Sequence, residues 1–184
     1  MGAANSNLSA PFFLILSSSN QTYNGTALEV CNASGKTALC ANGAIANSST
    51  SSFVFDKKSS SAFGTDTGTG FVEYLTSDRL QLDFRYSPIS NVAFADFVEP
   101  QNATYSGLYV AFNGDNLEIT DNYDDTTQLA TVNGGIIMYN RWLICTNTLY
   151  GGQGKPLLNW QLGRYTAENP SCQTVRVNKQ MVES

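Results

Sequence analysis

The chain of 184 residues contains no histidine. Without an imidazole it cannot form a Ser-His-Asp or Cys-His catalytic centre, and it cannot hold zinc or copper through histidine. We therefore expect no cofactor, and any catalysis would have to rely on carboxylates. The composition favours binding over an enzymatic role.

Charged side chains are also scarce. They make up 14% of the residues, whereas soluble domains contain about 25%. The ten Lys and Arg are scattered and the net charge is -5, so no basic stripe is present to bind nucleic acid or an anionic membrane. The longest apolar run, residues 11–16, is far shorter than the roughly 18 residues of a membrane span. We expect no nucleic-acid and no membrane partner.

Four cysteines stand in two spaced pairs, and neither pair has the C-x-x-C spacing of zinc or redox sites. Four cysteines allow three connectivities. We expect Cys31 to bond Cys40 and Cys145 to bond Cys172, because each bond closes a short loop. Disulfides of this kind are typical of extracellular proteins.

Asn-x-Ser/Thr sequons support the same location, and five of the six precede residue 50. They predict a secreted glycoprotein with a sugar-covered face. Residues 1–10 are interpreted as a disordered N-terminal segment that takes the place of a removed signal peptide. The sequons are Asn7, Asn20, Asn24, Asn32, Asn47 and Asn102.

Short alternations of apolar and polar residues, separated by Gly, Asn, Ser and Asp, predict an all-β fold. About twelve strands in one domain, residues 11–184, suit a compact antiparallel sandwich or barrel with two intrachain disulfides. The clearest turn is a hairpin at Asn113-Gly114, and Asn133-Gly134-Gly135 is expected to open a later strand. The expected strands are 12–16, 28–31, 53–55, 71–75, 80–86, 92–98, 108–112, 117–120, 136–139, 142–145, 157–162 and 174–177.

Internal repetition is faint. Aromatic-centred segments at 52–55, 92–95 and 159–162 permit a β-trefoil as the alternative, although their spacing is uneven.

The C-terminal third carries a family resemblance. Its segments are Arg141-Trp142-Leu143-Ile144-Cys145, then 157–163 around Trp160, then Cys172 before a Val-rich final strand. This pattern resembles an uncharacterised family of small secreted proteins of filamentous ascomycete fungi, with a more distant similarity to phialide cell-wall proteins and fungal IgE-binding antigens. The resemblance implies a secreted or wall-associated β-protein, and it implies no active-site residue.

Two acidic patterns suggest chemistry. Asp121, Asp124 and Asp125 follow the hairpin and are candidate Ca²⁺ ligands, although the full EF-hand spacing is missing and a solvated acidic loop explains them better. Glu73 and Asp83, on neighbouring expected strands, are the most plausible carboxylate pair for glycoside hydrolysis, but nothing in the sequence fixes their separation.

Aromatic residues gather around the Gly-rich loop at 151–154. Tyr150 and Tyr165, which are expected in loops, are the better candidates for contact with a ligand. Trp142 and Trp160 are weaker candidates, because tryptophan near a disulfide more often packs in the core.

The sequence favours a monomeric, secreted fungal protein, effector-like or associated with the cell wall, that binds a host protein or a cell-wall glycan. The alternatives are a carboxylate-dependent glycoside hydrolase and a passive structural wall glycoprotein.

Overall fold

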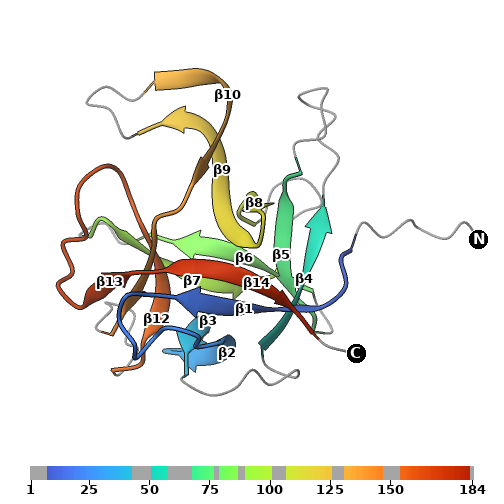
Figure 1. Cartoon of the computed structure of the whole chain (residues 1–184), viewed down its shortest axis with the longest axis vertical. Coiled ribbons are helices and arrows are strands. Elements are labelled where there is room, and N and C mark those ends of the chain that lie inside the picture. The colour runs from blue at the N-terminus through green and yellow to red at the C-terminus, as the bar shows by residue number, and fades with distance from the viewer. Residues whose placement is uncertain are drawn as a thin grey trace, which may run out of the picture.

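The structure is a computed structural model, and it describes residues 8–42, 51–57, 68–76, 79–86, 90–100, 107–125, 131–146 and 154–182. The all-β prediction is confirmed, because every described element is a strand and every pairing is antiparallel. Figure 1 shows their arrangement. The fourteen strands are β1 (Phe12–Ser17), β2 (Leu28–Ala33), β3 (Lys36–Ala41), β4 (Ser52–Lys57), β5 (Gly70–Tyr74), β6 (Leu80–Arg85), β7 (Val92–Val98), β8 (Val110–Asn113), β9 (Asn116–Asp124), β10 (Thr131–Tyr139), β11 (Trp142–Cys145), β12 (Leu157–Gln161), β13 (Cys172–Thr174) and β14 (Arg176–Met181).

Six of these strands close a barrel. Strand β1 pairs with β14 and β4, β4 pairs with β5, β5 with β8, β8 with β9, and β9 with β14. The ring has no free edge, which protects its backbone from pairing with other chains. Its interior is apolar, with Phe12, Leu14 and Leu16 from β1 all buried.

Three hairpins, β2–β3, β6–β7 and β11–β12, cover the barrel. Their second strands pair with one another in a triangle: Ala38 of β3 lies opposite Asp96 of β7, Phe94 of β7 opposite Asn159 of β12, and Leu157 of β12 opposite Cys40 of β3. In each hairpin the two paired positions are two residues apart. The three hairpins are therefore equivalent about a threefold axis.

This equivalence extends to the core. Each hairpin places four apolar residues at the same positions on its inner face. Such alternation is the pattern of a strand with one face on a core. The three sets are Leu28, Val30, Leu39 and Ala41; Leu82, Phe84, Ala95 and Phe97; and Trp142, Ile144, Leu158 and Trp160.

A six-stranded barrel covered by three equivalent hairpins is the connectivity of a β-trefoil, the alternative that the sequence left open. The three aromatic segments proposed as repeats are not equivalent to one another. Phe53 belongs to the barrel strand β4, Phe94 lies on the outer face of its hairpin, and Trp160 lies on the inner face. The three units share the same strand pairing, but they do not share the same residues at equivalent positions.

Both predicted disulfides are confirmed, Cys31 with Cys40 and Cys145 with Cys172. By the register of the triangle, Cys31 and Cys40 in the first hairpin correspond to Arg85 and Asp96 in the second. Those two side chains form an ion pair, with Arg85 Nη2 3.0 Å from Asp96 Oδ2. Each of the first two hairpins thus has a cross-link between the same two equivalent positions. It is a disulfide in the first hairpin and an ion pair in the second.

Strand β3 was absent from the sequence prediction. Its outer residues Ala38 and Cys40 are buried, as are its inner residues Leu39 and Ala41, because the neighbouring hairpins cover both faces. These four residues form a continuous run without an aromatic or β-branched side chain, so neither alternation nor composition marks the segment as a strand.

Two turns differ from the prediction in detail. The hairpin between β8 and β9 is present, but Asn113 pairs with Asn116, so its two turn residues are Gly114 and Asp115. Gly114 has a φ of 63°, as the first turn residue of such a hairpin requires. Gly134 lies inside β10, where the pairing with β9 shifts register, instead of opening the strand.

Order at the N-terminus begins before residue 11. Leu8 forms a β-bridge with Asp56. The Ser9 hydroxyl accepts a hydrogen bond from the Phe55 amide, and the Ser9 amide donates one to the Phe55 carbonyl. Residues 1–7 lie outside the described part of the chain. Among the described residues, the structure contains no helix long and apolar enough to cross a membrane.

We predict that the double variant Arg85→Cys/Asp96→Cys forms a third disulfide. The two positions correspond to Cys31 and Cys40, whose Cα atoms are 6.0 Å apart. Oxidised protein should lack free thiols, and reductant should cost the variant up to about 3 kcal/mol more stability than it costs the wild type, which loses only its two native disulfides. Urea unfolding of both proteins with and without reductant measures this. Persistent free thiols after oxidation would contradict the equivalence of the hairpins.

Candidate functional site

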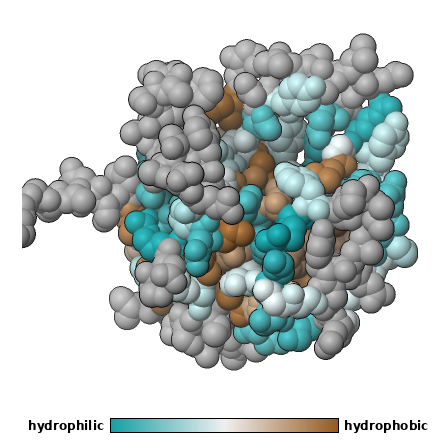
Figure 2. All heavy atoms as spheres, turned by 180° about the vertical axis from the view of Figure 1, so that it is seen from behind, coloured by the Kyte–Doolittle hydropathy of each residue, from teal (hydrophilic) through white to brown (hydrophobic). Residues whose placement is uncertain are grey.

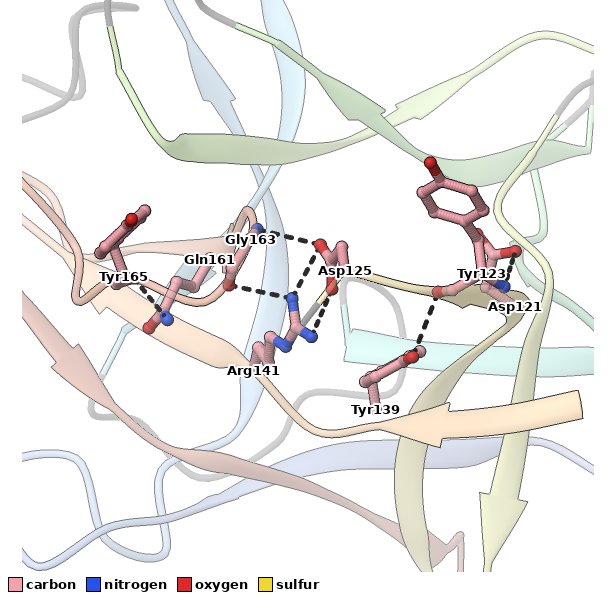
Figure 3. Close-up of polar contacts among 8 residues, drawn as sticks. All are labelled: Asp121, Tyr123, Asp125, Tyr139, Arg141, Gln161, Gly163 and Tyr165. Carbon is pink, nitrogen blue, oxygen red and sulfur yellow. Dashed lines mark hydrogen bonds and ion pairs between the residues drawn. The ribbon is translucent and has the colours of Figure 1, made fainter. Parts of the chain in front are cut away.

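The candidate site lies where β9 extends beyond the barrel. Strand β9 has nine residues, and its second half pairs with β10 as a ribbon that leaves the barrel at the top of Figure 1. The loop that follows β12 meets the end of this ribbon. We call the described residues that gather there the tyrosine surface: Asp121, Tyr123, Asp125, Tyr139, Arg141, Gln161, Gly163 and Tyr165 (Figure 3).

An ion pair between Arg141 and Asp125 lies at the centre of this surface. Arg141 Nη2 is 2.6 Å from Asp125 Oδ1, and Nη1 is 3.1 Å from Oδ2. Arg141 Nη1 also donates to the Gly163 carbonyl, while the Gly163 amide donates to Asp125. The pair therefore fastens the loop after β12 to the end of β9. The hydrogen bonds from Arg141 lower the pKa of Asp125, and the positive charge of Arg141 adds to this effect.

Two exposed tyrosines lie on either side of this pair (Figure 3). Tyr165 is 67% exposed and Tyr123 is 46% exposed. The Tyr165 ring carries the Arg164 guanidinium over its face at 4.8 Å, and Gln161 Nε2 donates to its backbone carbonyl. The Tyr123 amide donates to Asp121, and its carbonyl accepts from the Tyr139 hydroxyl. Both rings are accessible; Arg164 holds the Tyr165 ring, and Asp121 and Tyr139 hold the backbone of Tyr123.

Tyr139 contacts two residues of the tyrosine surface, Arg141 through its ring and Tyr123 through its hydroxyl. The Arg141 guanidinium lies 4.6 Å from the centre of its ring. Burial raises the pKa of Tyr139, and the charge of Asp124 adds to that shift. Its hydroxyl therefore stays protonated and can donate to Tyr123 throughout the neutral range.

The acidic residues predicted as Ca²⁺ ligands all belong to this region. Asp125 accepts hydrogen bonds from Arg141 and from the Gly163 amide, and Asp121 accepts one from the Tyr123 amide. Within the described ranges, no three His, Cys, Asp or Glu side chains gather closely enough to hold a metal ion.

The two tryptophans are core residues. Trp142 is fully buried and donates from Nε1 to the Leu117 carbonyl, and Trp160 packs edge-on against it at 4.9 Å. Neither ring can contact a ligand. Tyr150 lies outside the described residues. Of the four aromatic candidates, Tyr165 is the one that the structure places on the surface.

The carboxylates proposed for hydrolysis occupy different environments. Glu73 is buried and accepts from Gln81 at one oxygen and from Arg79 at the other. Asp83 lies directly opposite Asp96 across the β6–β7 hairpin. Both oxygens of Glu73 are thus engaged in holding β5 to its neighbours, which suits a structural role.

Three of the six sequons fall within described residues, and they differ. Asn24 and Asn32 are exposed and use Oδ1 to accept turn hydrogen bonds. Asn20 is half-buried, and its Nδ2 donates to Gln173. Asn7, Asn47 and Asn102 lie outside the described part of the chain.

Sequence reasoning missed Tyr123 and the partners Arg141, Gln161 and Asp125 as a linked group. Arg141 and Asp125 are 16 residues apart, and their contact depends on a ribbon whose length the pattern did not show. The alternation of apolar and polar residues stops at Asp121, so no signal in the sequence showed that β9 continues to Asp124.

Comparison with known proteins identified no relative: no family model, no curated protein and no solved structure matches the chain.

We predict that Asp125→Asn loosens the loop at Gly163 and costs about 1 kcal/mol of unfolding free energy at pH 7, since Asp125 is 39% exposed and water weakens the pair. Because folding lowers the pKa of Asp125, this stabilisation is present above the ordinary value of 3.8 and is lost as the pH falls through the lower folded value. The stability difference between wild type and variant should therefore disappear in strong acid.

Urea unfolding at several pH values and hydrogen exchange at the Gly163 amide measure this effect. Asp115→Asn, in the exposed β8–β9 turn, is the matched control. Equal destabilisation by both substitutions, or unchanged exchange at Gly163, would contradict the role of the Arg141–Asp125 pair.

Proposed function

We propose that the chain is a secreted binding protein that recognises polysaccharide at a fungal cell wall or at the interface between a fungus and its host. The observation that carries this proposal is the pair of exposed rings, Tyr123 and Tyr165, on either side of the Arg141–Asp125 pair. The fungal setting rests on the family resemblance of the C-terminal segments.

The chemistry of this surface suits sugars. A sugar ring presents C–H groups from its faces and hydroxyl groups from its rim. Aromatic rings offer a flat apolar area at little entropic cost, and nearby amides and charged groups orient the hydroxyls. Gln161, Arg164 and Asp121 supply such groups beside the two tyrosines.

The described surface seen from behind is mixed in polarity (Figure 2). Figure 2 shows hydrophilic and pale side chains interspersed with small hydrophobic patches over the described part of one face. Stable protein interfaces usually have a continuous apolar centre. A scattered pattern suits a polysaccharide better.

Secretion is supported by the two disulfides, which suit an oxidising compartment. The sequons on exposed turns agree with it. We propose that the protein acts as a monomer, without a cofactor.

A host protein is the second candidate partner. Strand β10 is an edge strand of the sheet with β9 as its neighbour, and its Ile136 and Met138 side chains are exposed. An exposed strand edge can accept a strand from another chain.

The test is retention on insoluble chitin and β-glucan. We expect Tyr165→Ala to weaken binding by about tenfold through loss of ring contact. Tyr109→Ala is the matched control, because Tyr109 is also exposed but packs against Phe71 elsewhere on the fold.

Depletion assays give the affinities, and infiltration of plant tissue records any cell death. Equal binding by wild type and Tyr165→Ala would contradict the proposed site. Cell death that depends on Ile136 and Met138, without retention on either polysaccharide, would favour the protein partner. Release of soluble sugar would instead favour the hydrolase alternative.

We further predict that Asn24 and Asn32 carry glycans when the chain passes through a eukaryotic secretory route, whereas Asn20 does not. The glycan bonds to Nδ2, and at Asn20 this atom contacts Gln173 in the fold. Single Asn→Gln variants, compared by intact mass before and after glycan removal, measure this. Loss of a glycan in Asn20→Gln would contradict the prediction.

A further inference from the structure

A second site lies on the hairpin cover of the barrel. A groove of about 730 Å³ is lined by the start of β3, the end of β7, Thr76 and Leu80. This volume is within the range of small-molecule sites, about 300–1,000 Å³. Its polar lining includes Lys36, Thr37, Arg85, Asp96 and Glu99, and none of these belongs to the tyrosine surface.

Asp96 is the unusual member of this lining. Its side chain is 2% exposed, and Oδ2 accepts two hydrogen bonds, from Nε and Nη2 of Arg85. No described residue donates to Oδ1, and Nη1 of Arg85 likewise has no acceptor in the described part of the chain. A buried carboxylate oxygen without a donor is costly. Two side chains of the groove lining thus carry an acceptor and a donor that the described residues leave unused.

The charges in the groove balance. Lys36 and Arg85 are cationic, and Asp96 and Glu99 are anionic. A strongly charged ligand of either sign would therefore meet repulsion as well as attraction. The remaining lining combines the Thr37 hydroxyl with apolar surface, including Leu80 and Pro100. This mixture matches a neutral ring that carries several hydroxyls.

We propose that this groove binds a single neutral sugar residue, with one hydroxyl donating to Asp96 Oδ1 and others accepting from Arg85 and Lys36. The C–H face of the sugar lies against Leu80 and Pro100. The site is independent of the tyrosine surface, so either can exist without the other.

The fold itself does not need this carboxylate. The equivalent positions in the other hairpins hold Cys40 and Asn159, and an asparagine is therefore compatible with the triangle. Burial raises the pKa of Asp96 despite the opposing effect of Arg85, so folding becomes less favourable as the pH rises through the ordinary range of this carboxyl. A charge that costs stability in a groove is a common mark of a binding site.

The proposal is tested by titrating ¹⁵N-labelled protein with methyl β-glucoside and N-acetylglucosamine as neutral probes, and with glucuronate and glucosamine as charged ones. We expect the neutral probes to shift the amides of Gly35, Thr37 and Val98. Asp96→Asn should weaken this binding at least about tenfold, without lowering the melting temperature at pH 7. Lys36→Gln is a second variant that removes a donor without altering the triangle.

Asp83→Asn is the matched control. Asp83 lies directly opposite Asp96 but is not part of the groove lining, and this variant should bind as the wild type does. Equal loss in both variants, a response to the charged probes alone, or no shift at the groove amides would overturn the proposal. Shifts at Tyr123 and Tyr165 with a silent groove would also overturn it, while supporting the tyrosine surface.

Discussion

The fold depends on the triangular pairing of β3, β7 and β12. Each strand of the triangle pairs with both others, and the same two positions are used in each hairpin. This staggered register aligns the inner faces of the hairpins, so that Leu39, Ala95 and Leu158 point into the core at equivalent places. Because a shift of one residue would turn every inner side chain outwards, the triangle fixes all three hairpins at once.

The cross-links follow from this geometry. A position on the outer face of the triangle is buried by the neighbouring hairpins, so a residue there needs a partner. Cys40 bonds Cys31, Asp96 pairs with Arg85, and Asn159 donates to the Leu157 carbonyl. In the third hairpin, Cys145 forms a disulfide with Cys172 of β13 instead. Of these three outer positions, only that of Asp96 is satisfied by an ion pair, and its hairpin also lines the groove.

Much of this architecture could be predicted from the sequence, and the limits have physical causes. Short runs rich in aromatic and β-branched residues are a local property, and they located β7 and β11 with the bounds that the structure shows. The disulfide pairing followed from short loop closure. Strand β3 was missed because its buried residues are Ala, Leu and Cys without alternation. The threefold symmetry was missed because equivalent positions hold residues as different as Leu28 and Trp142. The Arg141–Asp125 pair joins segments that only the fold brings together, so no local pattern could show it.

Both proposed sites lie where the threefold symmetry is broken. Strand β9 occupies the place of β1 and β5 in its unit, yet it has nine residues where they have six and five. The additional length carries Tyr123 and Asp125 beyond the barrel and creates the tyrosine surface. In the groove, Asp96 is a carboxylate where its equivalents are uncharged. A threefold scaffold needs equivalent strand pairing in each unit for stability, so departures that add length or leave a buried carboxylate oxygen without a described donor are better explained by binding than by folding. The closed barrel thus acts as a rigid support, and recognition is assigned to the parts that the symmetry does not require.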